Sequence, residues 1–336
     1  RHARGVGGGG GHAVSGGPFF IVGNDRSGTT MLRLILDRGP DAAIPPESMF
    51  LTDVELTDAE LGSGAQRSLD ELWEHPKVRL WELPGPPPRV PPGLEPADAR
   101  RFVLGAPFAA YAARFGKARW GDKTPHYVHH VDRLLEIWPD ARFVVLVRDG
   151  RDVAVSLRSM PFGPNNAWAA AQWWARGIRA GEDAQRRHPG SVMTVRYEDL
   201  AQDPPTHVPP ICEFLGLHYS EEMLALEKAD RSRIVADQKS WFPTLFDGIN
   251  TRAVARWQRE MSTREQAVFA ALAAPELARF GYPVPDRPLR PPPARAERLY
   301  DRHNEIMRDV NFVKLRVVQE RGRELRLALR RRVRGG

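Results

Sequence analysis

The sequence is poor in cysteine and contains no long apolar run. Cys212 is the single cysteine among 336 residues, which excludes an internal disulfide and a multi-cysteine zinc site. A membrane-spanning helix needs roughly 18 consecutive apolar residues, and the sequence has no such stretch. We therefore expect a protein of a reducing compartment, the cytoplasm. The first residue is Arg1 rather than Met, so the sequence leaves room for a preceding leader.

The chain also has little net charge outside its last residues. The formal net charge is +7, and residues 318–336 contribute +5 of it through seven arginines and two glutamates. The basic character is therefore a property of the tail. We expect the tail to be either a solvated helix end or a peripheral attachment to anionic lipid, nucleic acid or acidic protein. Nothing in the sequence predicts recognition of a specific nucleic acid.

Three segments have compositions that do not support a packed core. Residues 1–17 are rich in glycine and are expected to be a disordered lead. Residues 84–96 are rich in proline and are expected to run along the surface as an extended excursion. Residues 285–336 are expected to combine a proline-rich linker with a basic amphipathic helix. The remaining residues, 18–284, are predicted to form one main domain.

The last segment carries an apolar stripe. Its residues are spaced 7, 4, 3 and 4 apart, a heptad-like pattern: Leu299, Ile306, Val310, Val313 and Val317. The stripe is expected to dock on the body of the protein or on a second copy, so a homodimer is one expectation. It is too short, and too interrupted by Gly322, to predict a coiled coil.

Short apolar strands alternate with amphipathic helices in the main segment. Residues 19–22, 143–147 and 192–195 are predicted as strands, and each is followed by a predicted helix: 29–37, one from about Asp152, and one around Ile211. A further helix is expected over 128–138. Continuously apolar strands are typical of a parallel sheet covered on both faces. The sequence therefore predicts an α/β fold, a P-loop-like parallel sheet flanked by helices, with a C-terminal helical extension.

A polar turn joins the first strand to the first helix. Residues 23–30 read Gly-Asn-Asp-Arg-Ser-Gly-Thr-Thr, which gathers backbone N–H groups and a helix N-terminus around one point, where a phosphate or sulfate is stabilised. Gly28 lets the main chain approach closely, and Arg26 offers a planar fork. Hydroxyl donors are added by Ser27, Thr29 and Thr30. A P-loop NTPase fits less well because it needs a lysine after the glycine; a purely structural turn stays open.

This turn resembles the 5′-phosphosulfate-binding loop of the sulfotransferases that use 3′-phosphoadenosine 5′-phosphosulfate (PAPS). The resemblance is closest to the Arg-Ser-Gly-Thr-Thr form of the tyrosylprotein and related bacterial members, whereas many cytosolic members have lysine in place of Arg26. It implies that residues 26–30 hold the 5′-phosphate and the sulfuryl group in transfer.

A second anion site is predicted after the strand 143–147. Arg148 follows that strand at the carboxyl edge of the sheet, where open α/β folds bind ligands, and Ser156 comes eight residues later on the next helix. The pair resembles the family's 3′-phosphate motif, R-D-x-x-D-x-x-x-S. The alternative is that Arg148 forms ordinary surface ion pairs with Asp149 or Asp152.

Weaker matches extend the predicted donor site. Residues 195–200, Val-Arg-Tyr-Glu-Asp-Leu, resemble a family segment that follows a core strand. The resemblance implies that Tyr197 lies near the adenine; otherwise it is a half-buried tyrosine that ends a strand. The family's late Arg-Lys-Gly loop has no clean copy in this sequence. Lys239 and Arg252 lie in the expected region and are predicted to contribute weakly.

Sulfuryl transfer needs positive charge near the moving group and a base for the acceptor's proton, by analogy with phosphoryl transfer. Arg26 is one predicted cation. Lys123 lies in Asp-Lys-Thr-Pro, which resembles a family segment whose lysine reaches the sulfate; pairing with Asp122 as a loop lysine is the alternative. No metal is expected, because side chains and amides can meet the charge of the donor.

Glu47 is predicted to be the general base. It follows two prolines just beyond the first helix, and its place resembles that of the glutamate base in the tyrosylprotein branch. A surface acid beside a helix is the alternative, and His126 stays open because cytosolic members commonly use a histidine. With His129 and His130, His126 shares one helical face, interpreted as surface or acceptor cleft rather than as a metal site.

The sequence therefore predicts transfer of a sulfuryl group from PAPS to a hydroxyl or amine. The acceptor is a small molecule, carbohydrate, lipid or peptide, since segments 48–118 and 160–185 carry no motif that chooses among them. Two alternatives remain. One is a catalytically degenerate sulfotransferase-like binding protein that its tail recruits to anionic surfaces, and the other is a P-loop nucleotide kinase.

Overall fold

The structure is a computed structural model that describes residues 16–158, 160, 162–229, 247–285, 291–293 and 295–314. Nearly all of the predicted glycine-rich lead, the predicted donor residue Lys239 and the basic tail thus lie outside the described residues. Among the described residues, no helix is long and apolar enough to cross a membrane.

Five parallel strands form one sheet in the order β2-β3-β1-β4-β5. The strands are β1 (Phe19–Gly23), β2 (Ala42–Ala43), β3 (Arg119–Lys123), β4 (Arg142–Val147) and β5 (Val192–Arg196). The predicted parallel α/β sheet is confirmed, and its three predicted strands are β1, β4 and β5. The prediction missed β2, which has two residues, and β3, whose sequence Arg-Trp-Gly-Asp-Lys contains no apolar run.

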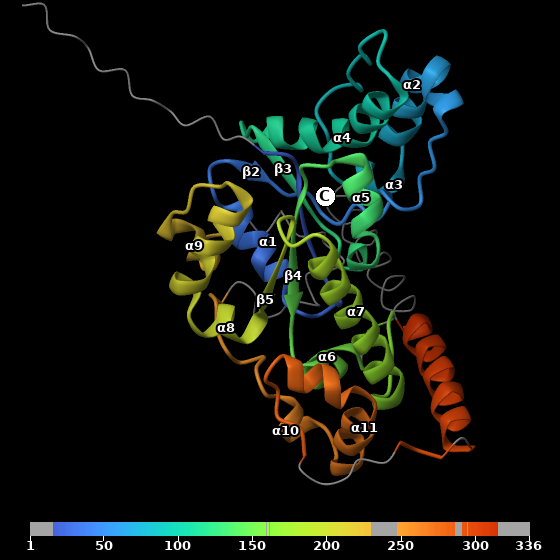
Figure 1. Cartoon of the computed structure of the whole chain (residues 1–336), viewed down its shortest axis with the longest axis vertical. Helices are drawn as coiled ribbons and strands as arrows, with labels where there is room; N and C mark the ends of the chain where they lie inside the picture. Colours follow the sequence, from blue (N-terminus) through green and yellow to red (C-terminus); the bar gives the residue numbers. More distant parts are fainter. Residues whose placement is uncertain are drawn as a thin grey trace, which may run out of the picture.

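Helices cover both faces of the sheet (Figure 1). They are α1 (Thr29–Asp37), α2 (Asp58–Trp73), α3 (Pro76–Arg79), α4 (Pro96–Arg114), α5 (Val131–Ile137), α6 (Gly150–Leu157), α7 (Ala167–Arg187), α8 (Tyr197–Gln202), α9 (Pro204–Leu215), α10 (Trp257–Glu260) and α11 (Thr263–Arg279). Short 3₁₀ turns are η1 (Pro125–His129), η2 (Glu221–Leu224) and η3 (Leu226–Lys228). A last helix covers residues 295–314.

The predicted helix over 128–138 is instead two elements, η1 and α5. Pro125 begins the first of them, and His130 between them has φ −130 and ψ 20, outside the helical region. The break turns the chain before α5 begins, so the three histidines do not lie along one continuous α-helix.

The side chains of each strand point alternately to the two faces of the sheet, and each face has its own hydrophobic core. Phe19 and Ile21 are fully buried against α1, α8 and α9, whereas Phe20 and Val22 are fully buried in the core that includes α4, α5 and α7. Successive side chains of a strand point to opposite faces, so β1 contributes to both cores. In Figure 1, α1, α8 and α9 accordingly lie on one side of the sheet and α4, α5 and α7 on the other. Cys212 of α9 is buried in the first core.

The sheet brings two loops together at its carboxyl edge. β1 lies beside β4, with Gly23 opposite Leu146, so the chain leaves both strands at the same edge. From β1 it continues to α1 and the β2 side of the sheet, and from β4 it continues to α6 and the β5 side. Such a switch point leaves a crevice between the two loops, the usual ligand site of open α/β sheets.

Candidate donor-binding and catalytic site

A cavity of about 710 Å³ lies at this switch point. Its wall includes residues from both predicted anion loops: Arg26, Gly28, Thr29, Thr30, Arg148 and Ser156. Glu47, Tyr197 and Arg252 line it as well. Of the predicted residues that the structure describes, Ser27 and Lys123 do not line the cavity; both are buried behind its wall, 1% and 3% exposed. The volume suits a ligand of nucleotide size.

The first loop is shaped by two residues with positive φ. Arg26 has φ 65, and Gly28, the N-cap of α1, has φ 90. At Gly28 a side chain is also excluded by space, because a Cβ atom would lie 2.3 Å from Cδ2 of Tyr197. No side-chain cap occupies the first-turn amides of α1, which leaves the N-terminus of this helix suited to an anion.

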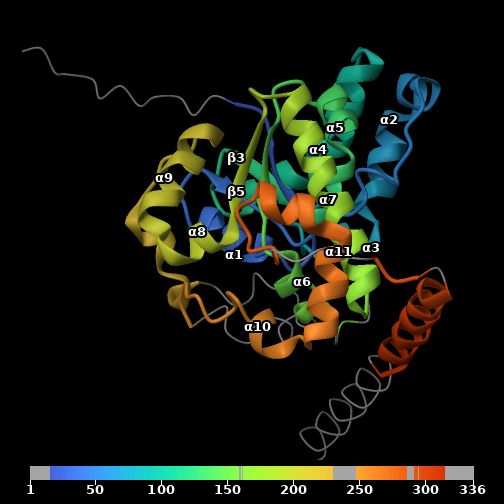
Figure 2. The same cartoon turned by 60° about the horizontal axis from the view of Figure 1, so that its bottom comes forward.

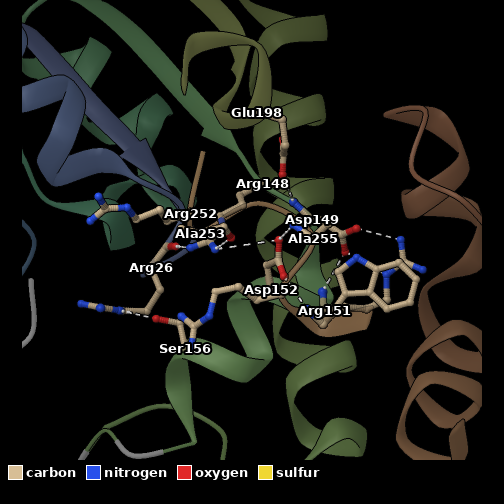
Figure 3. A network of polar contacts seen from close by, with 12 residues as sticks. Arg26, Arg148, Asp149, Arg151, Asp152, Ser156, Glu198, Arg252, Ala253 and Ala255 are labelled. Atoms are coloured by element: carbon tan, nitrogen blue, oxygen red, sulfur yellow. Dashed lines mark hydrogen bonds and ion pairs between the residues drawn. The ribbon is translucent and has the colours of Figure 1, made fainter. Parts of the chain in front are cut away.

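The second loop contacts the first directly. Nε of Arg26 donates to Oγ of Ser156 at 2.9 Å, and Nη1 of Arg148 donates to the carbonyl oxygen of Arg26 at 2.8 Å (Figure 3). The two predicted anion sites, about 120 residues apart in sequence, therefore belong to one cavity.

Arg148 is 5% exposed, so it is not a surface arginine, although it does form a buried ion pair with Asp152 at 3.9 Å. Asp149 instead pairs with Arg151 at 2.7 Å. The guanidinium of Arg148 lies 4.8 Å from the centroid of the Tyr197 ring, a cation–π contact. Its Nε atom has no hydrogen-bond partner among the described residues. A buried, unpaired donor of this kind is suited to a ligand anion.

Tyr197 begins α8 and is 6% exposed, so it is not a half-buried tyrosine that ends a strand. Burial raises its pKa, against the opposing effect of Arg148. The ring lies between the Gly28 turn and the Arg148 guanidinium and thus braces both loops. Its edge remains part of the cavity wall.

Positive charge accumulates around the cavity. Burial, followed by the neighbouring charge of Arg148, lowers the pKa of Arg26 to about 10, so the Arg26 guanidinium remains charged at neutral pH. Arg256, which the sequence analysis did not single out, also lines the cavity and is held by Glu260 at 2.8 Å. The arrangement favours a polyanionic ligand.

Glu47 and Lys123 form an ion pair at the cavity wall. The Lys123 side chain is 4% exposed and that of Glu47 is 24% exposed, so the carboxylate faces the cavity with the ammonium behind it. The alternative of a loop lysine paired with Asp122 is wrong in both respects, because Lys123 lies on β3 and binds Glu47.

A buried network fixes the residues next to this pair. Oγ of Ser48 donates to Oδ2 of Asp122 at 2.8 Å and lies 2.9 Å from the Tyr127 hydroxyl. Burial raises the pKa of Asp122 to about 6, although the hydrogen bonds from Ser48 and Thr124 lower it. Because Ser48 follows Glu47 and Asp122 precedes Lys123, the bond between them fixes the backbone on both sides of the ion pair.

Asp25 is a second carboxyl group in the wall. Burial, with the neighbouring Glu47 carboxylate, raises its pKa to about 6, while Lys123 and Arg26 act in the opposite direction. In the sequence, only its position directly before Arg26 pointed to the site, and the family motif assigns no role to this position.

Residues 248–256 supply a further part of the cavity wall, next to the two anion loops. The Asp152 carboxylate accepts from the backbone N–H groups of Ala255 and Trp257, both at 2.8 Å, and Arg148 donates to the carbonyl oxygen of Ala253 (Figure 3). Ala255 has φ 56, an unfavourable conformation for alanine. These bonds therefore hold a strained backbone.

Arg252 lines the cavity from this segment. Its side chain is 67% exposed and pairs with Asp247 at 3.1 Å, so it is far less constrained than Arg148. Lys239, predicted with it, lies outside the described residues.

The histidine cluster lies beside the site. The rings of His126 and His130 are 5.1 Å apart, and those of His126 and His129 are 5.5 Å apart. No histidine is among the described residues that line the cavity, although the adjacent Pro125 is. The geometry therefore favours Glu47 over His126 as the group that reaches a ligand.

Fold and site together define an α/β protein with a basic cavity at the switch point of a parallel sheet and, in its wall, a carboxylate paired with a buried lysine. Comparison with known proteins agrees with this class. The model of the sulfotransferase family matches residues 18–221, and the chain belongs to that family.

Relatives and solved structures are distant. A putative protein-tyrosine sulfotransferase of Caenorhabditis briggsae is 25% identical over 247 residues, which cover 71% of this chain and 80% of that protein. The sulfotransferase domain of the olefin synthase of Synechococcus PCC 7002 is 26% identical with a TM-score of 0.54, covering 81% of this chain and 98% of that one. A sulfotransferase domain from the curacin biosynthetic pathway, 19% identical with a TM-score of 0.51 over 81% of this chain and 99% of that one, shares the fold.

Proposed function

We propose that this sulfotransferase uses PAPS as donor and transfers its sulfuryl group to a hydroxyl group. One observation carries the proposal: the Arg26 turn and the Arg148–Ser156 pair are joined by hydrogen bonds of 2.9 and 2.8 Å around a single cavity. A donor with a phosphate at each end needs two anion sites within one nucleotide's length. A nucleotide kinase would instead need the lysine that the first loop lacks.

In this proposal the Arg26 turn and the N-terminus of α1 bind the 5′-phosphosulfate. Arg148 and Ser156 bind the 3′-phosphate, and Tyr197 lies near the adenine. Arg252 supplies weaker attraction at the open side, and we keep Lys239 in this role on the sequence alone. The unpaired Nε of Arg148 and the N-terminus of α1, which has no side-chain cap, support the fit of an anionic ligand.

Glu47 is the base in this proposal. The acceptor oxygen forms a bond to sulfur, the bond from sulfur to the bridging phosphate oxygen breaks, and the acceptor's proton passes to the Glu47 carboxylate. The electrons of the broken bond leave with the 5′-phosphate of the desulfated product, where Arg26 and Lys123 offset the charge. The Glu47–Lys123 ion pair supports these roles, because it holds the base and a cation at the same wall.

The names of relatives support a proposal for the class of acceptor. The putative enzyme of Caenorhabditis briggsae and a zebrafish enzyme that is 25% identical over 79% of this chain are named for protein tyrosine. The Synechococcus domain belongs to an olefin synthase. Because the wall also carries the apolar side chains of Met31, Met49 and Phe162, we propose a hydroxyl on an apolar or aromatic carrier.

The first prediction concerns donor binding. Arg26→Ala and Arg148→Ala each weaken binding of 3′-phosphoadenosine 5′-phosphate (PAP), the desulfated product, by about 10- to 100-fold in isothermal titration, because each removes charge-assisted hydrogen bonds. Arg67→Ala, at an exposed arginine of α2, is the control and binds as the parent does. Ser156→Ala is a milder second variant, since Arg148 is buried.

PAP raises the melting temperature of the parent, and ATP with Mg²⁺ does not. Stabilisation by ATP and Mg²⁺ alone would identify a nucleotide kinase instead. Unchanged PAP affinity in both arginine variants would refute the donor site.

The second prediction separates binding from turnover. Glu47→Gln keeps the shape of the side chain and removes its basicity, so transfer of labelled sulfur from PAPS to a panel of phenols, tyrosine peptides and polyols falls by about 10²- to 10⁴-fold. PAP affinity stays close to that of the parent. A parent that binds PAP but modifies no member of the panel would support a binding protein without catalytic activity. If Glu47→Gln retains full turnover, another residue is the base.

A further inference from the structure

The helix over residues 295–314 (Figure 2, orange-red) contacts the body through polar side chains. Asn311 is 7% exposed, and its Nδ2 atom lies within hydrogen-bond distance of Oδ1 of Asn165 at 2.6 Å and of the carbonyl oxygens of Arg158 and Met160 at 3.2 and 3.3 Å. Asn304 accepts from the backbone N–H of Asn165 at 2.7 Å. An amide this well bonded fixes both the position and the rotation of the helix.

Farther along the same face, aromatic contacts continue the docking. Asp301 accepts from Nε1 of Trp168 at 3.1 Å, and the rings of Trp168 and Tyr300 are stacked with centroids 6.0 Å apart. The contact thus extends along most of the helix.

Because the polar face is turned inward, the apolar stripe faces outward. Leu299, Ile306, Val310 and Val313 are 69%, 51%, 38% and 58% exposed. This is the reverse of an ordinary surface helix, whose apolar face is buried against its own domain. Of the two expectations for the stripe, docking on the body is therefore wrong for its described residues. Val317, the last member, lies outside the described residues.

The spacing favours a helical partner. Leu299, Ile306 and Val313 fall on the d positions of a heptad, and Val310 falls on an a position, so the stripe is a narrow seam with a period of 3.5 residues. Its described length, from 299 to 313, is about 21 Å along the helix axis. His303 occupies the remaining a position, but its Nδ1 atom lies 3.4 Å from Nδ2 of Asn166 on the body, so it contributes less to the seam than the four apolar residues do.

Charge complementarity favours a second copy of this helix. In parallel pairing, Asp309 at a g position meets the e position of the other helix, which is occupied by Lys314. Both side chains are exposed, and twofold symmetry forms the pair twice.

We propose that two copies of this chain associate in parallel through the seam formed by Leu299, Ile306, Val310 and Val313. The seam is short, so the dimer is concentration-dependent with a dissociation constant in the micromolar range. The twofold axis runs along the seam, and each body lies on the outer side of its own helix. Dimerisation then stabilises the docked helix. Through the contacts of Asn311 with Asn165 and Met160, it also stabilises the segment that places Phe162 in the cavity wall.

Sedimentation over a concentration series tests the proposal on the full chain. The parent is expected to shift from monomer to dimer, whereas Ile306→Glu stays monomeric across the series because it places a charge in the seam. Phe312→Glu is the matched control, since it makes the same change at an exposed position of the same helix outside the seam and leaves the dimer intact. Melting temperatures close to that of the parent show that both variants fold.

A charge swap tests the partner and its direction. Asp309→Lys and Lys314→Asp each place like charges opposite one another and weaken self-association. Mixed in equal amounts, they form a heterodimer in which both pairs are attractive, visible by native mass spectrometry with one variant isotopically labelled. A dimer with no effect of either swap would exclude the parallel arrangement.

Two results overturn the proposal outright. One is a parent that remains monomeric throughout the series. The other is an Ile306→Glu variant that dimerises like the parent. A monomeric parent that floats with vesicles of anionic phospholipid, and loses this with Ile306→Glu, would assign the seam to a lipid surface instead.

Discussion

Asp25 places a titratable charge beside the loop proposed to receive an anion. Its pKa is raised to about 6 by burial and by Glu47, against the effects of Lys123 and Arg26. A bound anion disfavours the ionised carboxylate further, so binding favours the protonated form. PAP affinity in the parent is therefore expected to fall as the pH rises through about 6. The phosphates of PAP also titrate near this pH, so a matched variant is needed to isolate the carboxyl group.

Asp25→Asn supplies that comparison. Isothermal titration with PAP from about pH 5 to about pH 8 gives the ratio of the two dissociation constants, parent over variant. The ratio is near one at the acid end and rises roughly fivefold at the alkaline end, the effect of about 1 kcal/mol of repulsion. A ratio that stays constant over the whole range would show that Asp25 does not sense the ligand.

Single residues were predictable where a local turn defines their chemistry. Arg26 and Arg148 follow strands that the apolar pattern reveals, so the sequence alone brings them to the same sheet edge. Glu47 was found through its resemblance to a family position. Asp25 and Arg256 were missed because their place in the site depends on residues distant in sequence. Asp25 lies near Glu47, and Arg256 shares the cavity wall with the loop after β4.

At the scale of elements, Asp152 connects α6 to the segment 253–257. Its two oxygens each accept a backbone N–H, and those bonds hold the strained Ala255 and the adjacent Arg256. Asp152→Asn turns one acceptor oxygen into a donor, so one of these bonds is lost and the segment loosens. We expect PAP affinity to fall about 10-fold, with a change in melting temperature of only a few degrees.

Asp247→Asn is the control for this prediction. It breaks the exposed ion pair with Arg252, which contributes little because solvent screens it, so PAP affinity changes less than twofold. Equal effects of the two substitutions would mean that Asp152 has no special role in positioning the segment.

Elements were predicted well where hydrophobicity marks them. β1, α1, β4, α6, β5 and α9 were all found because their apolar residues recur with a clear period or in a continuous run. β3 was missed because its core position depends on tertiary contact rather than on hydrophobicity. Its Gly121 leaves room for the Phe19 ring, which lies 2.4 Å from where a Cβ atom would be. The break between η1 and α5 was missed because the apolar residues on both sides of it keep the spacing of one continuous helix.

For the whole molecule, the parallel sheet determines which loops meet, and the sequence therefore predicted one site from two distant motifs. The outward stripe of helix 295–314 could be found in the sequence, but its orientation could not. That orientation depends on Asn311 and Asn304 making better contacts with the body than the apolar residues do.

The burial of Cys212 has a consequence for the chemical durability of the molecule. The side chain is 1% exposed, and burial raises the pKa of the only thiol in the chain to about 12, so the nucleophilic thiolate is scarce at neutral pH. Peroxide and alkylating reagents thus find no accessible sulfhydryl in the folded state. Any alkylation of this cysteine records an opening of the layer formed by α1, α8 and α9, and its rate reports the local unfolding of that layer.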